Sequence, residues 1–156
     1  MKTLLLLVGK TTDKYLSAGI DDYAERIRHY MQFDITVIPA LKNAGSMSPE
    51  QQKMREGNMI TQQIGPQDTV VLLDERGQQM SSTELARWLQ KKQLTARRLV
   101  LVVGGSYGFA REVYDRADEQ LSLSRLTFPH QMVRLILTEQ IYRACTILKG
   151  EKYHHD

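Results

Sequence analysis

Four short apolar runs, separated by segments with helical spacing, constrain the fold of this chain more than any other feature of its sequence. The runs cover residues 3–8, 33–39, 69–73 and 98–103. Most of them are continuously apolar, which is typical of strands buried on both faces of a parallel sheet. The run at 33–39 alternates more with polar residues and is the best candidate for an edge strand. Because these strands alternate with helices, the sequence predicts an α/β domain with a mostly parallel sheet.

Helix signals lie between and after these runs. Ser48, Pro49 and Gln51 have the form of an N-cap residue, a first-turn proline and a capping-box partner. The predicted helices cover 13–31, begin at Ser48, cover 82–90, begin at Arg111, and run from His130 to about Leu148. The chain has 156 residues. A domain typically takes roughly 100–200 residues, so we expect one domain over residues 1–156.

The predicted last helix has two different sides. Its apolar face contains Val133, Ile136, Leu137, Ile141, Ala144, Ile147 and Leu148. The opposite side mixes Met132, Leu135 and Tyr142 with Arg134, Glu139 and Arg143. A helix that is apolar on one side and half apolar on the other usually packs twice, so we expect the second side to form a subunit interface.

Composition excludes several classes of protein. The single cysteine, Cys145, excludes an internal disulfide framework and a multi-cysteine zinc site, and it favours a reducing, cytoplasmic setting. The apolar run at the N-terminus ends at Gly9, which is too short for a signal peptide, and no stretch approaches the ~20 apolar residues of a membrane span. The net charge of +3 allows a polyanionic partner without demanding one.

Glycines follow the fourth apolar run and mark a candidate ligand site. Gly104, Gly105 and Gly108 lie where a parallel sheet places its ligands, at the carboxyl end of a strand. Their spacing matches neither the dinucleotide fingerprint nor the Walker phosphate loop, so nicotinamide dehydrogenases and nucleotide triphosphatases are disfavoured. A tight turn without a ligand is the alternative interpretation.

Other polar residues give weaker signals. Asp74 and Glu75 are interpreted as a solvated turn after the third strand, and His130 as a helix-start residue with a structural hydrogen bond. His29 is expected on the surface, and Cys145 is expected to be a buried, inert thiol. The segment 122–128 is neither a clean helix nor a clean strand. It suits a loop that offers backbone N–H and C=O groups to a heteroaromatic ligand.

Several motifs occur in the same order as in one protein family. They are Leu-Leu-Asp at 72–74, Val-Val-Gly-Gly-Ser-Tyr-Gly at 102–108, Leu-Ser-Leu-Ser-Arg-Leu-Thr-Phe-Pro-His-Gln-Met-Val-Arg at 121–134, Glu-Gln-Ile-Tyr-Arg-Ala at 139–144 and Lys-Tyr-His-His at 152–155. On these motifs the whole chain resembles the ribosomal RNA large subunit methyltransferase H family, which consists of small proteins of the SPOUT (α/β-knot) class. The Thr-Phe-Pro-His segment and the Tyr-His tail are the specific signals.

The resemblance implies a SPOUT α/β-knot fold, in which a mostly parallel sheet is flanked by helices and the C-terminal part forms a deep trefoil knot. It also implies a homodimer that transfers a methyl group from S-adenosylmethionine to N3 of a pseudouridine in 23S large-subunit rRNA, on the assembled ribosome. No metal and no membrane are expected. Carried over by motif, the cofactor pocket contains Leu73, Gly104, Leu123, Ser124, Arg125, Leu126, Thr127 and Phe128.

The chain end supplies a hypothesis for catalysis. Tyr153 and His154, with Arg143 on the preceding helix, are expected to complete the target-base pocket, because they are the polar groups most concentrated there. A proton must leave N3, so a nearby base or a water relay is expected. Two alternatives stay open: a non-catalytic, ribosome-associated binding protein of the same fold, and a methyltransferase for another rRNA or tRNA nucleotide.

Overall fold

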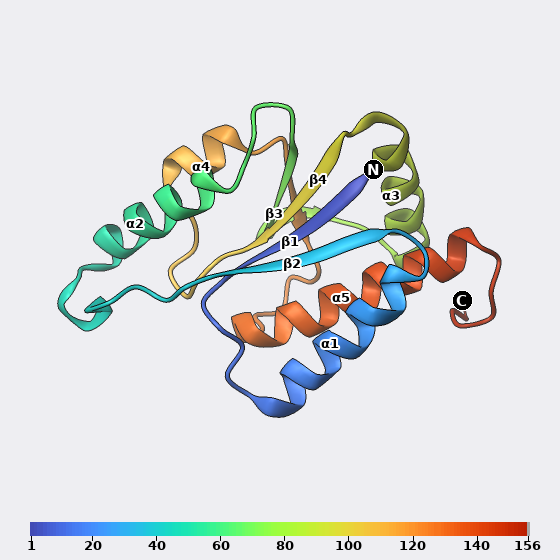
Figure 1. The fold of residues 1–156 in the computed structure, drawn as a ribbon, viewed down its shortest axis with the longest axis horizontal. Helices are drawn as coiled ribbons and strands as arrows, with labels where there is room; N and C mark the ends of the chain where they lie inside the picture. The colour runs from blue at the N-terminus through green and yellow to red at the C-terminus, as the bar shows by residue number, and fades with distance from the viewer. Residues whose placement is uncertain (156) are drawn as a thin grey trace.

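The computed structural model describes residues 1–155, in which a parallel sheet lies between two groups of helices (Figure 1). The strands are β1 (Lys2–Val8), β2 (Gln32–Ile38), β3 (Thr69–Gln79), β4 (Arg98–Val103) and β5 (Glu119–Ser122). The α-helices are α1 (Lys14–Arg28), α2 (Pro49–Gln62), α3 (Ser82–Thr95), α4 (Arg111–Arg116) and α5 (His130–Leu148). A 3-10 turn, Ala44–Ser46, precedes α2. The predicted α/β architecture is confirmed.

The sheet order is β2-β1-β4-β3-β5, and every neighbouring pair is parallel. β1 lies inside the sheet, where Leu5 is opposite Ile35 of β2 on one side and Leu101 of β4 on the other. The predicted edge position of β2 is therefore confirmed. The sequence did not predict β5, because this short strand at the other edge begins with the polar residues Glu119 and Gln120.

Two cores explain why the central strands are continuously apolar. Successive side chains of a strand point to opposite faces of the sheet. Leu5 and Leu7 of β1 therefore pack with residues of α1, α3 and α5, whereas Leu4 and Leu6 pack with residues of α2 and α4. Figure 1 shows α1 and α5 side by side on one side of the sheet and α2 and α4 on the other. Both faces of β1 and β4 are thereby covered.

Two helices begin with capping boxes. The Ser48 hydroxyl accepts from the backbone N–H of Gln51, and the Gln51 side chain accepts from the backbone N–H of Ser48, as the sequence predicted for α2. At α3 the N-cap is Ser81, whose partner is Glu84, so this helix begins at the predicted Ser82. A cap of this kind stabilises a helix by about 1 kcal/mol.

β3 continues past the predicted solvated turn, and that interpretation of residues 74–75 is wrong. The strand reaches Gln79, where it pairs with Ser122, and a register shift separates this pairing from the one between Leu73 and Leu121. Gly77 permits the close approach, because a Cβ there would lie 2.6 Å from the carbonyl carbon of Gln120. Pairing with β5 therefore holds this segment extended.

The burial of Arg134 differs from the prediction for the two sides of α5. The sequence analysis placed it on the mixed outer side, but the residue is fully buried. Its Nη2 donates to the Val8 carbonyl at 2.7 Å, and its Nη1 donates to the Gly9 carbonyl and to Oγ1 of Thr11, both at 2.8 Å. The guanidinium thus caps the carboxyl end of β1. No helix within residues 1–155 is both long enough and apolar enough to span a bilayer.

Candidate functional site

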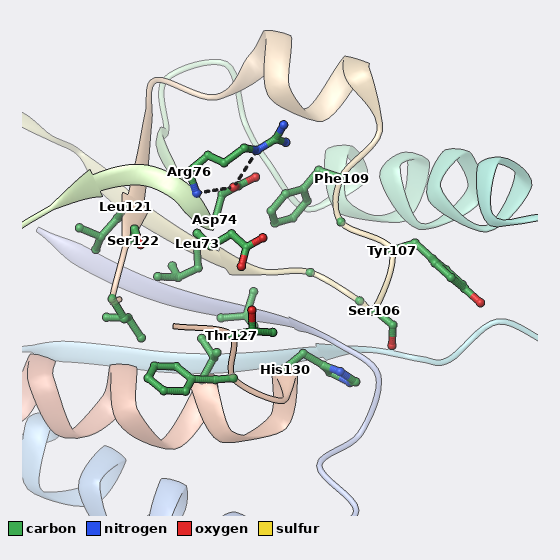
Figure 2. A pocket seen from close by; sticks show the side chains of 18 of the residues that line it. Leu73, Asp74, Arg76, Ser106, Tyr107, Phe109, Leu121, Ser122, Thr127 and His130 are labelled. Carbon is green, nitrogen blue, oxygen red and sulfur yellow. Dashed lines mark hydrogen bonds and ion pairs between the residues drawn. The ribbon is translucent and has the colours of Figure 1, made fainter. Parts of the chain in front are cut away.

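A cavity of about 750 Å³ lies at the carboxyl ends of β3, β4 and β5 (Figure 2). Most of its wall comes from three segments that are far apart in sequence: residues 73–76, residues 103–109 and residues 121–130. In open parallel sheets this edge is the usual position of a bound ligand. Its volume lies within the range of about 300–1,000 Å³ that is typical of small-molecule sites.

The cavity gathers most of the residues expected to bind a cofactor. The lining includes Leu73, Gly104, Leu123, Ser124, Leu126, Thr127 and Phe128. Arg125 does not line it, and its side chain is exposed. The motifs quoted from the second half of the chain therefore converge on one place.

The glycine turn after β4 brings backbone close to the cavity. A Cβ at Gly104 would lie 2.8 Å from the ring of Phe109, which is too close for an ordinary contact. Gly108 has φ +82°, a conformation that favours glycine. Phe109 in turn meets Tyr114 edge-on, with 5.7 Å between ring centroids. The turn therefore requires glycine at these positions for its own geometry, apart from any ligand.

The loop between β5 and α5 leaves polar backbone groups available. The Ser122 hydroxyl donates to the Ser124 carbonyl at 2.9 Å, and the Ser124 hydroxyl accepts from the Leu126 N–H at 3.0 Å. In the described part of the chain, no backbone–backbone hydrogen bond involves residues 125–128. Their amides and carbonyls beside the cavity match the expected mode of recognition for a heteroaromatic ring.

Asp74, Tyr114 and Arg76 form a hydrogen-bonded cluster in the cavity wall. Figure 2 shows the contacts between Asp74 and Arg76. The Tyr114 hydroxyl donates to Asp74, the Arg76 backbone N–H donates to Asp74 Oδ1 at 2.9 Å, and Arg76 Nη2 donates to the Tyr114 hydroxyl at 3.2 Å. Burial opposes ionisation of Asp74, but the hydrogen bonds from Tyr114 and Arg76 outweigh it and lower its pKa. The sequence analysis missed this cluster, because Tyr114 is 40 positions away from Asp74 and no local motif joins them.

His130 also lines the cavity, and its side chain makes no hydrogen bond within residues 1–155. The structural hydrogen bond expected at this position is therefore absent from that part of the chain. Burial and, to a lesser extent, the nearby Arg134 cation lower the pKa of its imidazole below the usual 6.5. Both effects favour the neutral imidazole over the imidazolium.

The three expected catalytic residues form a second cluster around Glu139 that does not line the cavity. Arg143 Nη2 lies 2.6 Å from Glu139 Oε1, its Nη1 lies 3.1 Å from Nδ1 of His154, and its guanidinium stacks over the Tyr153 ring. The Tyr153 hydroxyl donates to the same Glu139 oxygen at 3.1 Å. Burial, followed by hydrogen bonds to Tyr23 and Glu139, raises the pKa of Tyr153. The chain end is thereby tied to α5.

The structure also confirms two further interpretations of the sequence, which concern Cys145 and His29. Cys145 is buried, as predicted, and burial raises the pKa of its thiol to about 11. His29 is exposed, as predicted, at the C-terminal end of α1. Among residues 1–155, no three His, Cys, Asp or Glu side chains are grouped as metal ligands.

Comparison with known proteins gives one consistent family. The family described as "Predicted SPOUT methyltransferase" matches residues 1–154. A Bacteroides fragilis protein named "Ribosomal RNA large subunit methyltransferase H" is 53% identical over the full length of both chains. A Christiangramia forsetii protein of the same name is 49% identical over 99% of each chain.

A solved structure supports the fold. It is a probable methylase family protein from Haemophilus influenzae, which matches 99% of this chain and 70% of its own with a TM-score of 0.57. At 11% identity this similarity concerns the fold alone. The expected trefoil knot fits the arrangement seen here, in which residues 121–130 lie against both the end of β3 and the glycine turn.

Proposed function

The chain belongs to the SPOUT methyltransferase family, and we propose that it transfers a methyl group from S-adenosylmethionine to N3 of a pseudouridine in 23S large-subunit rRNA. Its membership makes it a methyltransferase, and the names of its relatives point to large-subunit rRNA as the substrate. The donor, the target atom and the residue roles are proposals. The observation that carries them is the cavity of about 750 Å³ in which the glycine turn and the 122–128 loop meet.

The lining residues fit a nucleoside donor with a charged sulfur. Leu73, Leu123 and Phe128 provide apolar surface for an adenine ring, while backbone groups of residues 125–128 other than the Leu126 N–H provide hydrogen bonds to its edge. Bound there, the donor supplies a methyl group on a positively charged sulfur, which is already activated for displacement. The role of the chain is therefore to position the donor and the acceptor nitrogen and to exclude water.

We propose that the Glu139 cluster acts on the cavity of a second copy in a homodimer. His130 and Arg143 are 13 positions apart on α5, which corresponds to about 20 Å along the helix axis. Arg143, Tyr153 and His154 are therefore out of reach of the cavity at the other end of their own helix. The mixed side of α5, with the half-buried residues Met132, Leu135 and Tyr142, is the surface proposed to bring two copies together.

The charge supports a preformed ribosomal substrate better than free RNA. Two copies together carry about +6, a modest positive charge for a protein that must grip phosphates unaided. Among the basic residues, Arg98 is already paired with Asp68 and Lys92 with Glu119, so fewer cations are available than the sequence suggests. An assembled ribosome offers a folded surface for recognition as well as phosphate charge. A ribosomal substrate also implies that the enzyme works in the cytoplasm.

The test combines a deletion strain with purified protein. We expect rRNA from the deletion strain to lack one methyl group on a large-subunit pseudouridine, as mass spectrometry of nuclease fragments will show. Purified protein with labelled S-adenosylmethionine should restore the mark on ribosomes from that strain. A methyl group missing from a tRNA or from another nucleotide would contradict the proposed target. Unchanged RNA together with no donor binding by calorimetry would favour the non-catalytic alternative.

A further inference from the structure

We propose that His130 is a catalytic residue that accepts the proton released from the target base. This inference rests on the proposed function, because it concerns the N3–H of a uracil-like ring placed in the cavity. The residues proposed to bind the donor position it, but none of them accepts that proton. His130 is the only histidine in the lining of the cavity as the structure describes it.

The position of His130 suits contact with the acceptor. It is the first residue of α5 and directly follows the loop that carries Thr127 and Phe128. Figure 2 shows its ring projecting from the start of α5 toward the side of the cavity where Ser106 lies. The ring is half-buried, so part of it stays accessible from the opening. An acceptor base that enters beside the 122–128 loop therefore meets this imidazole.

His130 is also chemically prepared to accept a proton. Neither ring nitrogen is hydrogen-bonded within residues 1–155, so whichever nitrogen lacks the proton has a free lone pair. His154 differs, because the Arg143 guanidinium donates to its Nδ1 and occupies that lone pair. Of the two imidazoles considered, His130 is thus the better proton acceptor.

The surroundings keep the imidazole neutral. One turn further along α5, the buried Arg134 cation has no carboxylate partner within residues 1–155, and its charge acts against protonation of His130. The charged side chains from other elements that line the cavity are Lys53 on α2 and Asp74, Glu75 and Arg76 on β3. The Glu56 carboxylate of α2 also lies beside the glycine turn, against Gly105. Asp74 is held by Tyr114 and Arg76, and Lys53 is paired with Glu50, so neither is free to pair with the imidazole.

The step balances in atoms and charge. The N3–H bond breaks and its proton passes to the free nitrogen of His130, while the electron pair left on N3 forms the bond to the methyl carbon. The bond between carbon and sulfur breaks, and its electron pair stays on sulfur, so the positively charged sulfur becomes a neutral thioether. The imidazolium then releases its proton to solvent. No metal or oxidant takes part.

The test compares His130→Gln and His130→Asn with the matched control His29→Gln, which changes an exposed histidine at the end of α1. Single-turnover rates on unmethylated ribosomes are measured from pH 5 to 9 at saturating donor. We expect the wild-type rate to fall as pH drops through a value below 6.5. Removal of a general base typically costs about 10²-fold or more, so both His130 variants should lose about that factor near pH 7.5.

Several readouts separate catalysis from folding. The donor affinity and melting temperature of the His130 variants should stay near those of wild type, and His130→Ala should regain activity with added imidazole. The inference is overturned if His130→Gln keeps the wild-type rate. It is also overturned if His130→Gln slows the reaction but its rate still falls at low pH as the wild-type rate does, because another group then takes the proton. Failure of the proposed function looks different, since the wild-type protein itself would then transfer no methyl group to ribosomes.

Discussion

Arg134 and Val8 are joined by a hydrogen bond between a fully buried guanidinium and the last carbonyl of β1, with 2.7 Å between Nη2 and the oxygen. The same guanidinium reaches the Gly9 carbonyl, and Gln131 on the same turn accepts from the backbone N–H of Thr12 at 3.0 Å. The loop after β1 is therefore fastened to the start of α5, where His130 faces the cavity. The Arg134–Val8 contact therefore contributes both to the stability of the fold and to the position of His130 at the cavity.

Replacement of Arg134 by methionine should lower the free energy of unfolding by about 2–4 kcal/mol, because buried carbonyls of Val8 and Gly9 lose their donors. Arg134→Lys should cost less, since an ammonium group keeps some of these bonds. Urea denaturation at fixed protein concentration measures both. The control is Arg26→Met, an exposed residue on α1, which should change stability by less than about 0.5 kcal/mol. Equal losses for the Arg134 and Arg26 variants would contradict this account.

Gly104→Ala should weaken donor binding, because the added methyl group would lie 2.8 Å from the Phe109 ring and force the turn to move. We expect the dissociation constant for S-adenosylmethionine to rise by about 10-fold or more, since displacement of one wall typically costs at least 1–2 kcal/mol of binding free energy. Isothermal titration calorimetry gives the value. Gly45→Ala is the matched control, since a Cβ there has no neighbour within 4 Å. Unchanged affinity in Gly104→Ala would place the donor elsewhere.

Two inactive variants should complement each other if the site is shared between copies. We expect Gly104→Trp to fill the donor cavity and His154→Ala to remove a proposed catalytic group, so that each homodimer is inactive. After co-expression in equal amounts, half of the dimers are mixed and each contains one intact composite site. The expected activity is about a quarter of wild type. Methyl transfer to ribosomes measures it, with each variant alone as the control. No recovery in dimers shown to be mixed would argue that each chain uses its own tail.

Acid should destabilise the protein partly through Asp68. Hydrogen bonds from Arg98, at 2.6 and 3.0 Å, are the main cause that lowers the pKa of Asp68 below its usual 3.8. A lowered pKa in the folded state stabilises the fold above about pH 4, and this contribution disappears as pH falls through the lowered value. Asp68→Asn should therefore cost about 1 kcal/mol at pH 7 for a partly exposed pair.

The pH dependence of that variant is the decisive readout. Asp68→Asn should lose less stability than wild type between pH 5 and pH 2, as followed by urea denaturation at each pH. The control is Asp22→Asn, which removes an exposed ion pair on α1 and should change stability at pH 7 by less than about 0.5 kcal/mol. Identical acid curves for wild type and Asp68→Asn would show that this ion pair does not contribute.

The strands, their parallel arrangement and the helix starts were predictable because their signals are local. Continuous apolar runs such as that in β4 reflect burial on both faces, and Ser48 with Gln51 encodes a helix start within four residues. β5 escaped prediction because three of its four residues are polar and the strand gains its conformation from pairing with β3. Asp74 was misinterpreted for the same reason, since its partner Tyr114 is distant in sequence.

The sequence by itself determined the α/β class, the order of elements and the motifs that form the cavity, because spacing and burial patterns act over a few residues. Only the tertiary structure decided which polar groups meet. It buried Arg134 under β1, turned His130 toward the cavity, and placed Arg143, Tyr153 and His154 at the far end of α5. These contacts join positions many residues apart, and whether a side chain is solvated or buried depends on the neighbours that folding brings to it.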